Sequence, residues 1–204
     1  MTATRTRILV EIALTIALSA VLHLVKLWQM PFGGSFSLEM LPVFVLALRR
    51  GLVPGLIAGA LFGIADYFME PYVVHWVQFF LDYPIAFGAI GLAGAWTPLW
   101  RRLVGTGRTA LAVAWVIPAA VVTGAIGRYV AHFSSGVVFF ATTAMGGPLG
   151  NGQSAFGNPA ALKAASVYSA LYNLYVPVSA AACLVAMVVL MPVLERAVPP
   201  GGRS

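Results

Sequence analysis

Charged residues are scarce in this chain of 204 residues: 12 Lys and Arg and 6 Asp and Glu make up 9% of it, while hydrophobic residues make up 60%. A soluble domain carries about 25% charged residues, so the shortage excludes a surface that faces water on all sides. Cysteine is almost missing too, and the single Cys183 excludes a disulfide framework. No small-residue cleavage site follows the first apolar run, so we expect no cleaved signal peptide. The composition indicates a multi-pass protein of the cell membrane.

Apolar runs divide the chain into predicted membrane helices, each of which needs about 20 residues to cross a hydrocarbon core of about 30 Å. Glycine and proline occur inside these runs, which is common in membrane helices. We predict one all-α transmembrane domain over residues 1–204 with six helices, of which the second is short. The predicted helices cover residues 8–27, 38–48, 52–69, 75–96, 110–140 and 164–194.

Basic residues are distributed unevenly between the ends of these helices. With a cytoplasmic N-terminus, nine of the twelve fall on the cytoplasmic side: Arg5, Arg7, Arg49, Arg50, Arg101, Arg102, Arg108, Arg196 and Arg203. This positive-inside bias predicts that both termini are cytoplasmic. The positive charge then reflects topology, and we expect no nucleic-acid partner. The Gly-, Asn- and Pro-rich loop 145–163 is predicted to be extracellular, where it either covers the outer face or has no role.

Ionisable side chains inside a membrane are costly and usually face a cavity or a partner. On the predicted topology, those of this chain gather in the outer half of their helices: Glu39, Asp66, Glu70, His75, Asp82, Arg128 and His132. The inner half is almost free of charge apart from Glu11. A polar cluster on one side, without a polar path beneath it, predicts a binding pocket and not a pore.

The fourth predicted helix supplies the first candidates for this pocket. His75, Gln78 and Asp82 are spaced so that they share one helical face, with Tyr83 beside them. An acid in this position either meets a ligand or forms an ion pair with Arg128 that neutralises a buried charge.

The fifth and sixth predicted helices supply the others. Arg128, His132, Gly136 and Phe140 follow one another at steps of four residues and form one stripe, although a single histidine on an apolar face is more often a core residue. Three tyrosines share a face of the sixth helix, with an amide about a quarter-turn away: Tyr168, Tyr172, Tyr175 and Asn173. Aromatic rings with a carboxylate suit an organic cation, and amide and imidazole groups suit a heteroaromatic amine.

Four groups of residues resemble a known family in their order and spacing: SLEMLP at 37–42 with ALRRG at 47–51, QFFLDYPIAF at 78–87 with GLAG at 91–94, GRYVAH at 127–132 with SG at 135–136 and FF at 139–140, and YS at 168–169 with YN at 172–173. Together they resemble the thiamine-specific substrate-binding (S) component of energy-coupling factor (ECF) transporters. The resemblance covers most of residues 8–194 and implies six helices, cytoplasmic termini and a thiamine pocket near the outer surface.

The resemblance also implies roles for individual residues. The substrate-binding residues would be Asp82 for the cationic ligand and its aminopyrimidine, Tyr83, His132, Tyr168 and Asn173 for polar contacts, and Gly136 and Phe140 for the wall on which a ring stacks. The segment Gly33, Gly34, Ser35 and Phe36 would form a lid. Three features depart from the family: Asp82 replaces a common Glu, Phe140 replaces a Trp found in some members, and the loop 145–163 is longer.

Uptake by such a component requires partners, by the same resemblance: a coupling transmembrane subunit and two ATPase subunits. The chain itself contains no G-x-x-x-x-G-K-[ST] motif for ATP, and we expect no cofactor and no metal. Ala13 and Ala17 form a small-xxx-small pair that would dock the coupling subunit, or else pack within the protein.

Other functions fit the sequence less well. An S component for a hydroxymethylpyrimidine precursor of thiamine, or for another small vitamin, would share the fold without needing a counter-charge. Asp66 and Asp82 could be imagined as the catalytic pair of an intramembrane aspartyl protease. Neither lies in a Gly-x-Gly-Asp motif, so we expect no enzymatic activity. A purely structural subunit would give no reason for polar residues to converge on one side.

Overall fold

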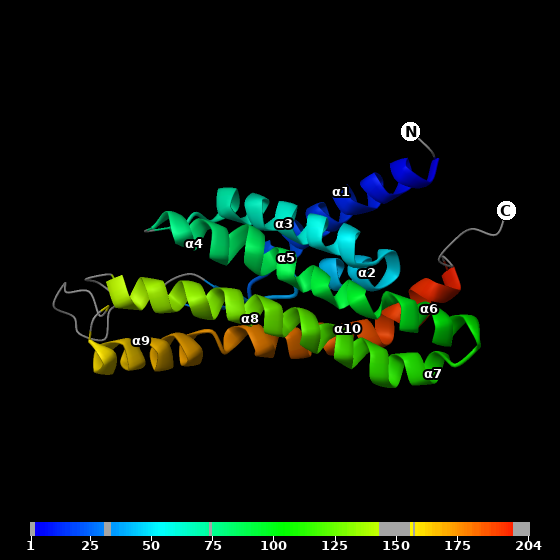
Figure 1. Cartoon of the computed structure of the whole chain (residues 1–204). Helices are drawn as coiled ribbons and strands as arrows, with labels where there is room; N and C mark the ends of the chain where they lie inside the picture. Colours follow the sequence, from blue (N-terminus) through cyan, green and yellow to red (C-terminus); the bar gives the residue numbers. More distant parts are fainter. Residues whose placement is uncertain (1–2, 31–33, 74, 143–155, 157, 198–204) are drawn as a thin grey trace.

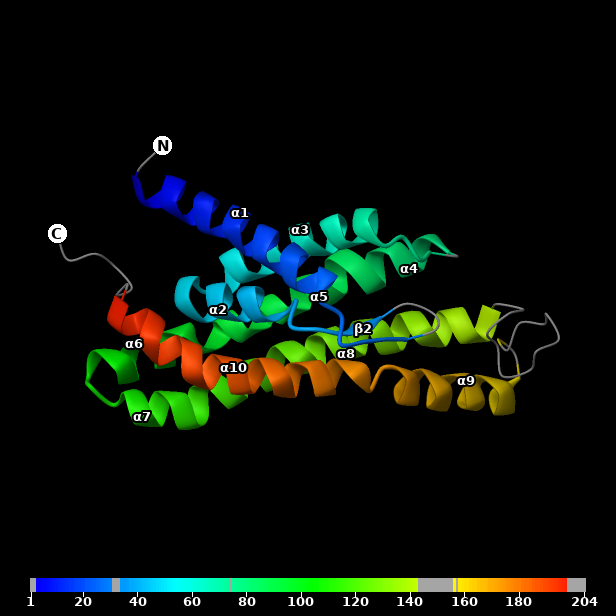
Figure 2. The ribbon, with the colours of Figure 1, turned by 180° about the vertical axis from the view of Figure 1, so that it is seen from behind.

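The computed structural model describes residues 3–30, 34–73, 75–142, 156 and 158–197. They form a bundle of helices that run side by side along one axis (Figure 1), and the view from behind shows the same arrangement (Figure 2). The helical elements, of which η1 and η3 are π-helical and η2 is 3₁₀, are α1 (Ala3–Leu24), α2 (Leu41–Arg50), α3 (Leu52–Met69), α4 (Trp76–Phe80), η1 (Leu81–Ile85), α5 (Ala86–Ile90), η2 (Gly91–Trp96), α6 (Thr97–Gly105), α7 (Thr109–Leu111), η3 (Ala112–Val116), α8 (Ile117–Thr142), α9 (Pro159–Tyr172) and α10 (Tyr175–Ala197).

Among the described residues, five helical segments are long and apolar enough to cross a membrane: Arg5–Leu24, Leu52–Met69, Trp76–Gly105, Thr109–Ala141 and Pro159–Ala197. The predicted second span corresponds to α2, which has only 10 residues and therefore measures about 15 Å. The strands β1 (Trp28–Gln29) and β2 (Ser35–Phe36) pair antiparallel just before it, and β2 lies in line with α2 along the bundle (Figure 2). A short β-hairpin thus lies in the predicted connection between the first and second helices, and the chain is not entirely α-helical as predicted.

The helix α9 begins inside the predicted extracellular loop 145–163, which corrects that boundary. Asn158 caps the helix, because its side-chain Oδ1 accepts hydrogen bonds from the backbone N–H groups of Ala160 and Ala161 at 3.1 and 3.3 Å. Pro159 follows at the first helical position, where a missing N–H costs nothing. The Asn-Pro pair therefore starts a helix and does not form a turn. Residues 143–155 and 157 of the loop lie outside the described residues.

The predicted sixth helix consists of two helices, α9 and α10, with a break at Asn173 and Leu174. Pro177 accounts for the break, because it has no N–H to donate to the carbonyl of Asn173, four residues earlier. The backbone N–H of Val176 donates to that carbonyl instead, at 3.1 Å. The break turns the side chain of Asn173 inward, where it is 4% exposed.

Apolar side chains fill the main core, which joins α2, α5, α8 and α10. Its fully buried members include Phe44, Ile90, Ile117 and Met187. Glycines allow α3 to approach α5 and η1 closely: a Cβ on Gly59 would lie 2.1 Å from the carbonyl oxygen of Phe87. This contact holds in place the segment that carries the polar residues of the fourth predicted helix.

Replacing Gly59 with alanine is therefore expected to lower the free energy of unfolding by about 1–3 kcal/mol, the usual cost of overpacking a tight contact. The measurement is thermal unfolding of the purified protein in detergent. Gly105→Ala is the matched control, since a Cβ there meets no atom within 4 Å. Equal melting temperatures for the two variants would show that the contact between α3 and α5 is not tight.

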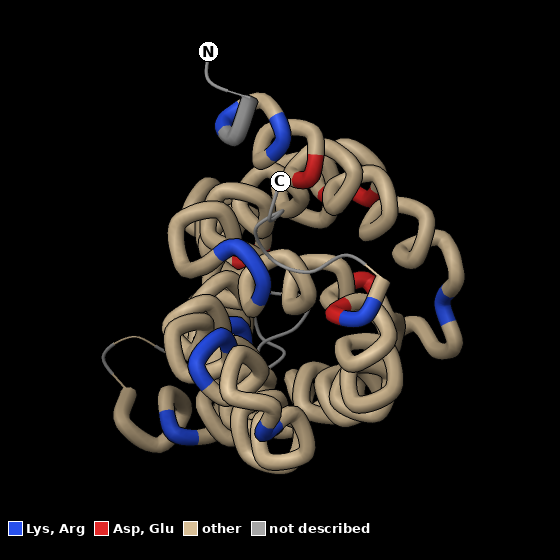
Figure 3. Tube along the Cα trace, turned by 90° about the vertical axis from the view of Figure 1, so that its right-hand side faces the viewer, with Lys and Arg blue, Asp and Glu red and all other residues tan. Residues whose placement is uncertain are grey.

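Arginines gather at one end of the bundle, where α1 begins and α2, α6 and α10 end (Figures 1 and 3). Two acidic residues pair with them. Glu11 of α1 forms an ion pair with Arg50, and the Oε1 atom of Glu195 lies 3.5 Å from the Nε atom of Arg49. These ion pairs connect α1 and α10 to α2 at this arginine-rich end.

Candidate functional site

A pocket lies in the half of the bundle remote from the arginine-rich end. The end of α1, the β-hairpin, α3, η1, α8 and the junction of α9 with α10 enclose it. Its lining contains the four acidic residues that do not pair at the other end: Glu39, Asp66, Glu70 and Asp82. Polar groups thus converge on one side of the bundle.

The structure brings six of the seven predicted substrate-binding residues to this pocket: Asp82, Tyr83, His132, Gly136, Phe140 and Asn173. Tyr168 does not line it. Its side chain is 44% exposed, and its ring packs edge-on against Phe140 with centroids 4.5 Å apart. Of the predicted lid, Gly34 and Ser35 line the pocket and Phe36 does not. Gly33 lies outside the described residues.

Asp82 is held by two hydrogen bonds from α8. The Nδ1 atom of His132 lies 2.8 Å from Asp82 Oδ1, and the hydroxyl of Ser135 donates to Asp82 Oδ2 at 2.6 Å. The Nε atom of Arg128 donates to His132 Nε2 at 3.2 Å. Because Nε2 accepts a hydrogen bond, the proton of His132 is on Nδ1 and the imidazole is neutral. Among the described residues, Asp82 therefore has neutral donors and no cationic partner.

The ion pair between Asp82 and Arg128, which the sequence left open, does not form. Arg128 instead donates from Nη2 to Glu39 Oε1 at 2.7 Å, and its guanidinium lies over the ring of Phe87, 4.1 Å from the centroid. Arg128 and Glu39 are each 3% exposed. A fully buried pair neutralises Glu39 and leaves the charge of Asp82 to the pocket.

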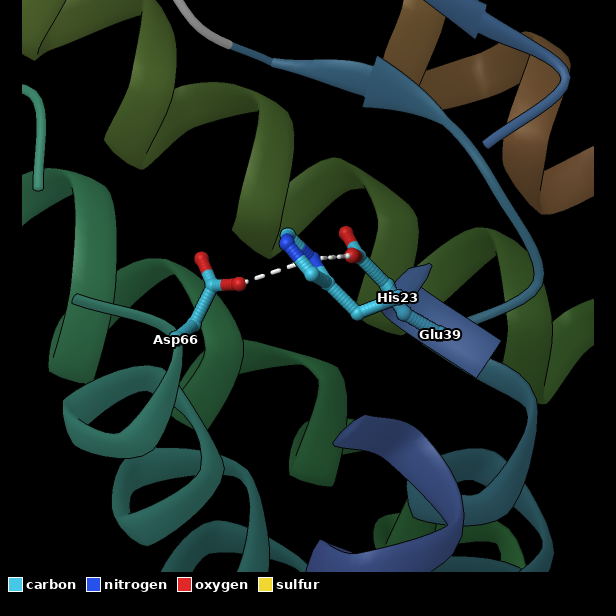
Figure 4. A group of neighbouring side chains, drawn as sticks. All are labelled: His23, Glu39 and Asp66. Carbon is cyan, nitrogen blue, oxygen red and sulfur yellow. Dashed lines mark hydrogen bonds and ion pairs between the residues drawn. The ribbon is translucent and has the colours of Figure 1, made fainter. Parts of the chain in front are cut away.

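A second histidine lies among the three remaining carboxylates. His23, at the end of α1, has its Nδ1 atom 2.8 Å from both Glu39 Oε2 and Asp66 Oδ1 (Figure 4). Glu70 Oε2 lies 3.4 Å from the Nε2 atom of His23, and Glu70 also accepts hydrogen bonds from Lys26 and Gln29. These contacts connect α1 to the end of α3.

The ligating atoms of His23, Glu39 and Asp66 lie within 4.8 Å of one another, which is close enough for a metal ion. However, the Nδ1 atom of His23 is hydrogen-bonded to Glu39, and Glu39 is already paired with Arg128. A metal at these atoms would have to displace the proton of His23 Nδ1 and would share the carboxylate of Glu39 with the guanidinium of Arg128, which holds Oε1. The geometry is that of a hydrogen-bonded network.

The β-hairpin forms one wall of the pocket. Its turn closes with a hydrogen bond from the N–H of Met30 to the carbonyl of Gly34 at 3.0 Å. Gly34 has a φ of 80°, and a Cβ there would lie 2.7 Å from the ring of Tyr175. Only glycine fits this position, and its lack of a side chain lets the hairpin pack closely on α10.

Aromatic rings and one amide form the opposite wall. Phe140 packs against Phe139 and Tyr172, with ring centroids 5.0 and 5.7 Å apart. The Nδ2 atom of Asn173 donates to the carbonyl of Ser169 at 2.9 Å, which fixes the amide at the end of α9. A Cβ on Gly136 would lie 2.3 Å from the Oγ atom of Ser169, so this glycine also lets α8 pack on α9.

Comparison with known proteins identifies the family. The family model of the thiamine transporter protein (Thia_YuaJ) matches residues 9–199. The chain belongs to this family. It is 36% identical to the thiamine transporter ThiT of Bacillus subtilis over 139 residues, which are 67% of this chain and 72% of that protein. It is 35% identical to ThiT of Lacticaseibacillus paracasei over 105 residues, which are 50% of this chain and 52% of that protein.

A solved structure of ThiT from Listeria monocytogenes has the same fold, with a TM-score of 0.72 at 24% identity over 96% of this chain and 97% of that one. The resemblance to this family of S components found in the sequence is therefore confirmed. As a member of this family with several helices that can span a membrane, the chain is a multi-pass membrane protein with a role in transport and not an enzyme.

Prediction from the sequence missed one residue of the pocket, His23, that the same reasoning could have found. His23 is an ionisable residue at the outer end of the first predicted helix, where Thr15 and Ser19 precede it at steps of four residues. Tyr72, Phe139 and Tyr175 also line the pocket. Tyr175 shares the predicted face of Tyr168 and Tyr172, whereas nothing in the spacing of Tyr72 separates it from ordinary interfacial aromatics.

Proposed function

We propose that the chain is the thiamine-binding S component of an ECF-type vitamin uptake transporter, with its pocket open toward the outside of the cell. One observation carries the proposal: Asp82, in a pocket lined by aromatic rings, is a carboxylate held only by neutral donors. Such a group needs a positive charge from a ligand. Thiamine has a quaternary thiazolium and an aminopyrimidine. Two relatives of this chain are named thiamine transporters.

In this proposal each wall has its own task. Asp82 provides the counter-charge and hydrogen-bonds the aminopyrimidine, while Tyr83 and Asn173 provide further polar contacts. Phe140 provides the face on which a ring stacks, and Tyr168 supports that ring from behind. The segment 33–36 acts as the lid, since part of it already lines the pocket.

The arrangement in the membrane follows from the two ends of the bundle. We place the arginine-rich end in the cytoplasm, together with both termini, by the positive-inside rule. The chain then passes through the bilayer six times, with a short second pass. Ala13 and Ala17 are exposed on α1, so they do not pack within the protein. This position favours docking of the coupling transmembrane subunit, which would work with two ATPase subunits.

Calorimetric titration of the purified protein, without partner subunits, tests the binding function. Thiamine is expected to bind one to one with a Kd below about 1 μM, or about −8 kcal/mol. A hydroxymethylpyrimidine, which has no positive charge, is expected to bind at least about tenfold more weakly. If the pyrimidine binds as tightly as thiamine, the protein is an S component for the precursor and the counter-charge has no role.

A further inference from the structure

The contacts of His23 determine its protonation state. Its two ring nitrogens face carboxylates from three places in the fold: Nδ1 faces Glu39, before α2, and Asp66, in α3, both at 2.8 Å. Nε2 faces Glu70, at the end of α3, at 3.4 Å. An ionised carboxylate only accepts hydrogen bonds. A lone pair on either nitrogen of His23 would therefore point at the lone pairs of a carboxylate oxygen.

Two of the three carboxylates beside His23 have cationic partners of their own. Arg128 donates to Glu39, and Lys26 forms an ion pair with Glu70, so neither carboxylate has to take up a proton. Asp66 Oδ1 is buried and has no hydrogen bond of its own among the described residues, because the Nδ1–H of His23 donates to Glu39. An ionised Asp66 in this position needs a positive charge beside it, and His23 is the side chain that can supply that charge.

We infer that His23 is a resident imidazolium that sets the fixed charge of the pocket at one negative, so that the pocket matches a monovalent cation. The inference rests on the proposed function of the site. Four carboxylates line the pocket, and Arg128 and Lys26 balance two of them. His23 balances a third, and His132 is neutral because it accepts a hydrogen bond from Arg128. The remaining charge is that of Asp82, which a single positive charge on the ligand cancels.

A neutral His23 would change the class of ligand. The fixed charge would then be two negative, with Asp66 as well as Asp82 uncompensated. A ligand with one positive charge would leave one carboxylate buried and unpaired, which is costly. His23 thus acts as a specificity-determining residue without touching the ring that Asp82 recognises.

Nitrogen NMR of the full chain labelled with ¹⁵N-histidine tests this inference without any ligand. The chain has three histidines, and His23→Gln and His75→Asn assign the signals by difference. His75 caps α4, where asparagine is also a good cap. At pH 7, both ring nitrogens of His23 are expected to carry protons, whereas His132 carries one on Nδ1 only. A neutral His23 would overturn the inference, and so would a spectrum that changes when EDTA removes a bound metal.

A pair of variants tests the charge balance through stability. His23→Gln removes the charge and is expected to lower the midpoint of thermal unfolding by at least about 6 °C. The double variant His23→Gln with Asp66→Asn restores the charge of the pocket and is expected to recover at least half of this loss. No recovery would mean that His23 stabilises the fold by packing alone. Because neither this measurement nor the NMR uses thiamine, failure here is distinguishable from failure of the proposed function.

Discussion

Changing Asp82 to asparagine is expected to weaken thiamine binding about 30- to 150-fold, or about 2–3 kcal/mol. Asparagine has the same shape and its carbonyl can still accept the hydrogen bond from His132 Nδ1, now 2.8 Å from Asp82 Oδ1. The variant therefore keeps the shape of the pocket wall and loses the charge, while the hydroxyl of Ser135, which donates to Asp82 Oδ2, accepts from the new amide instead. Without that charge, the thiazolium enters a pocket that no longer compensates it.

Two comparisons show whether the charge is responsible. A neutral isostere of thiamine, with carbon in place of the thiazolium nitrogen, is expected to bind the original protein and the Asp82→Asn variant within about threefold of each other, since no charge pairing is lost. Glu11→Gln makes the same chemical change at the arginine-rich end, where Glu11 pairs with Arg50. Titration calorimetry of both variants with both ligands completes the test. Equal losses for thiamine and the isostere would assign Asp82 a role in shape and not in charge.

Positions along single helices were predictable from the sequence, and this is why so much of the pocket was found. His132, Gly136 and Phe140 lie four residues apart on α8, and helical periodicity alone places them on one side. The cost of burying charge in a membrane pointed to Asp82 and Glu39. Both principles concern local structure or the bilayer, and they hold whatever the tertiary contacts are.

The sequence did not predict in the same way which charged side chains of different helices form ion pairs. Arg128 pairs with Glu39, 89 residues away, and not with Asp82. The choice depends on the segment between the β-hairpin and α2, which places Glu39 2.7 Å from the Arg128 guanidinium on α8. Residues 38–48 are apolar apart from Glu39. So short a run is equally consistent with a short span and with a helix of the core, and the sequence therefore did not show which helix Glu39 would face.

The π-helical turn η1 is a further feature that periodicity misses. Pro84 lies inside it and has no N–H to donate to the previous turn, so the helix widens over residues 81–85. As a result the neighbours Asp82 and Tyr83 both line the pocket. His75, which an ideal helix would place on the face of Asp82, caps α4 instead.

Changing Arg128 to methionine is expected to lower the free energy of unfolding by about 3–5 kcal/mol, the cost of leaving one partner of a buried ion pair unpaired. Methionine keeps much of the side-chain volume over Phe87, but Glu39 then has a buried charge without the guanidinium that lies 2.7 Å away. His132 Nε2 also loses its donor, so the proton that is held toward Asp82 can move and thiamine binding should weaken as well.

Unfolding of the detergent-solubilised protein, followed by circular dichroism, measures this effect. Arg7→Met is the matched control, because Arg7 is exposed and its ion pair with Glu11 is of the kind that contributes about 0.3–0.5 kcal/mol. The double variant with Glu39→Gln removes both charges and should be more stable than Arg128→Met alone, since position 39 then no longer carries a buried charge without its guanidinium partner. If the single and double variants unfold alike, Arg128 contributes packing over Phe87, and the buried ion pair is not what holds the segment before α2 to α8.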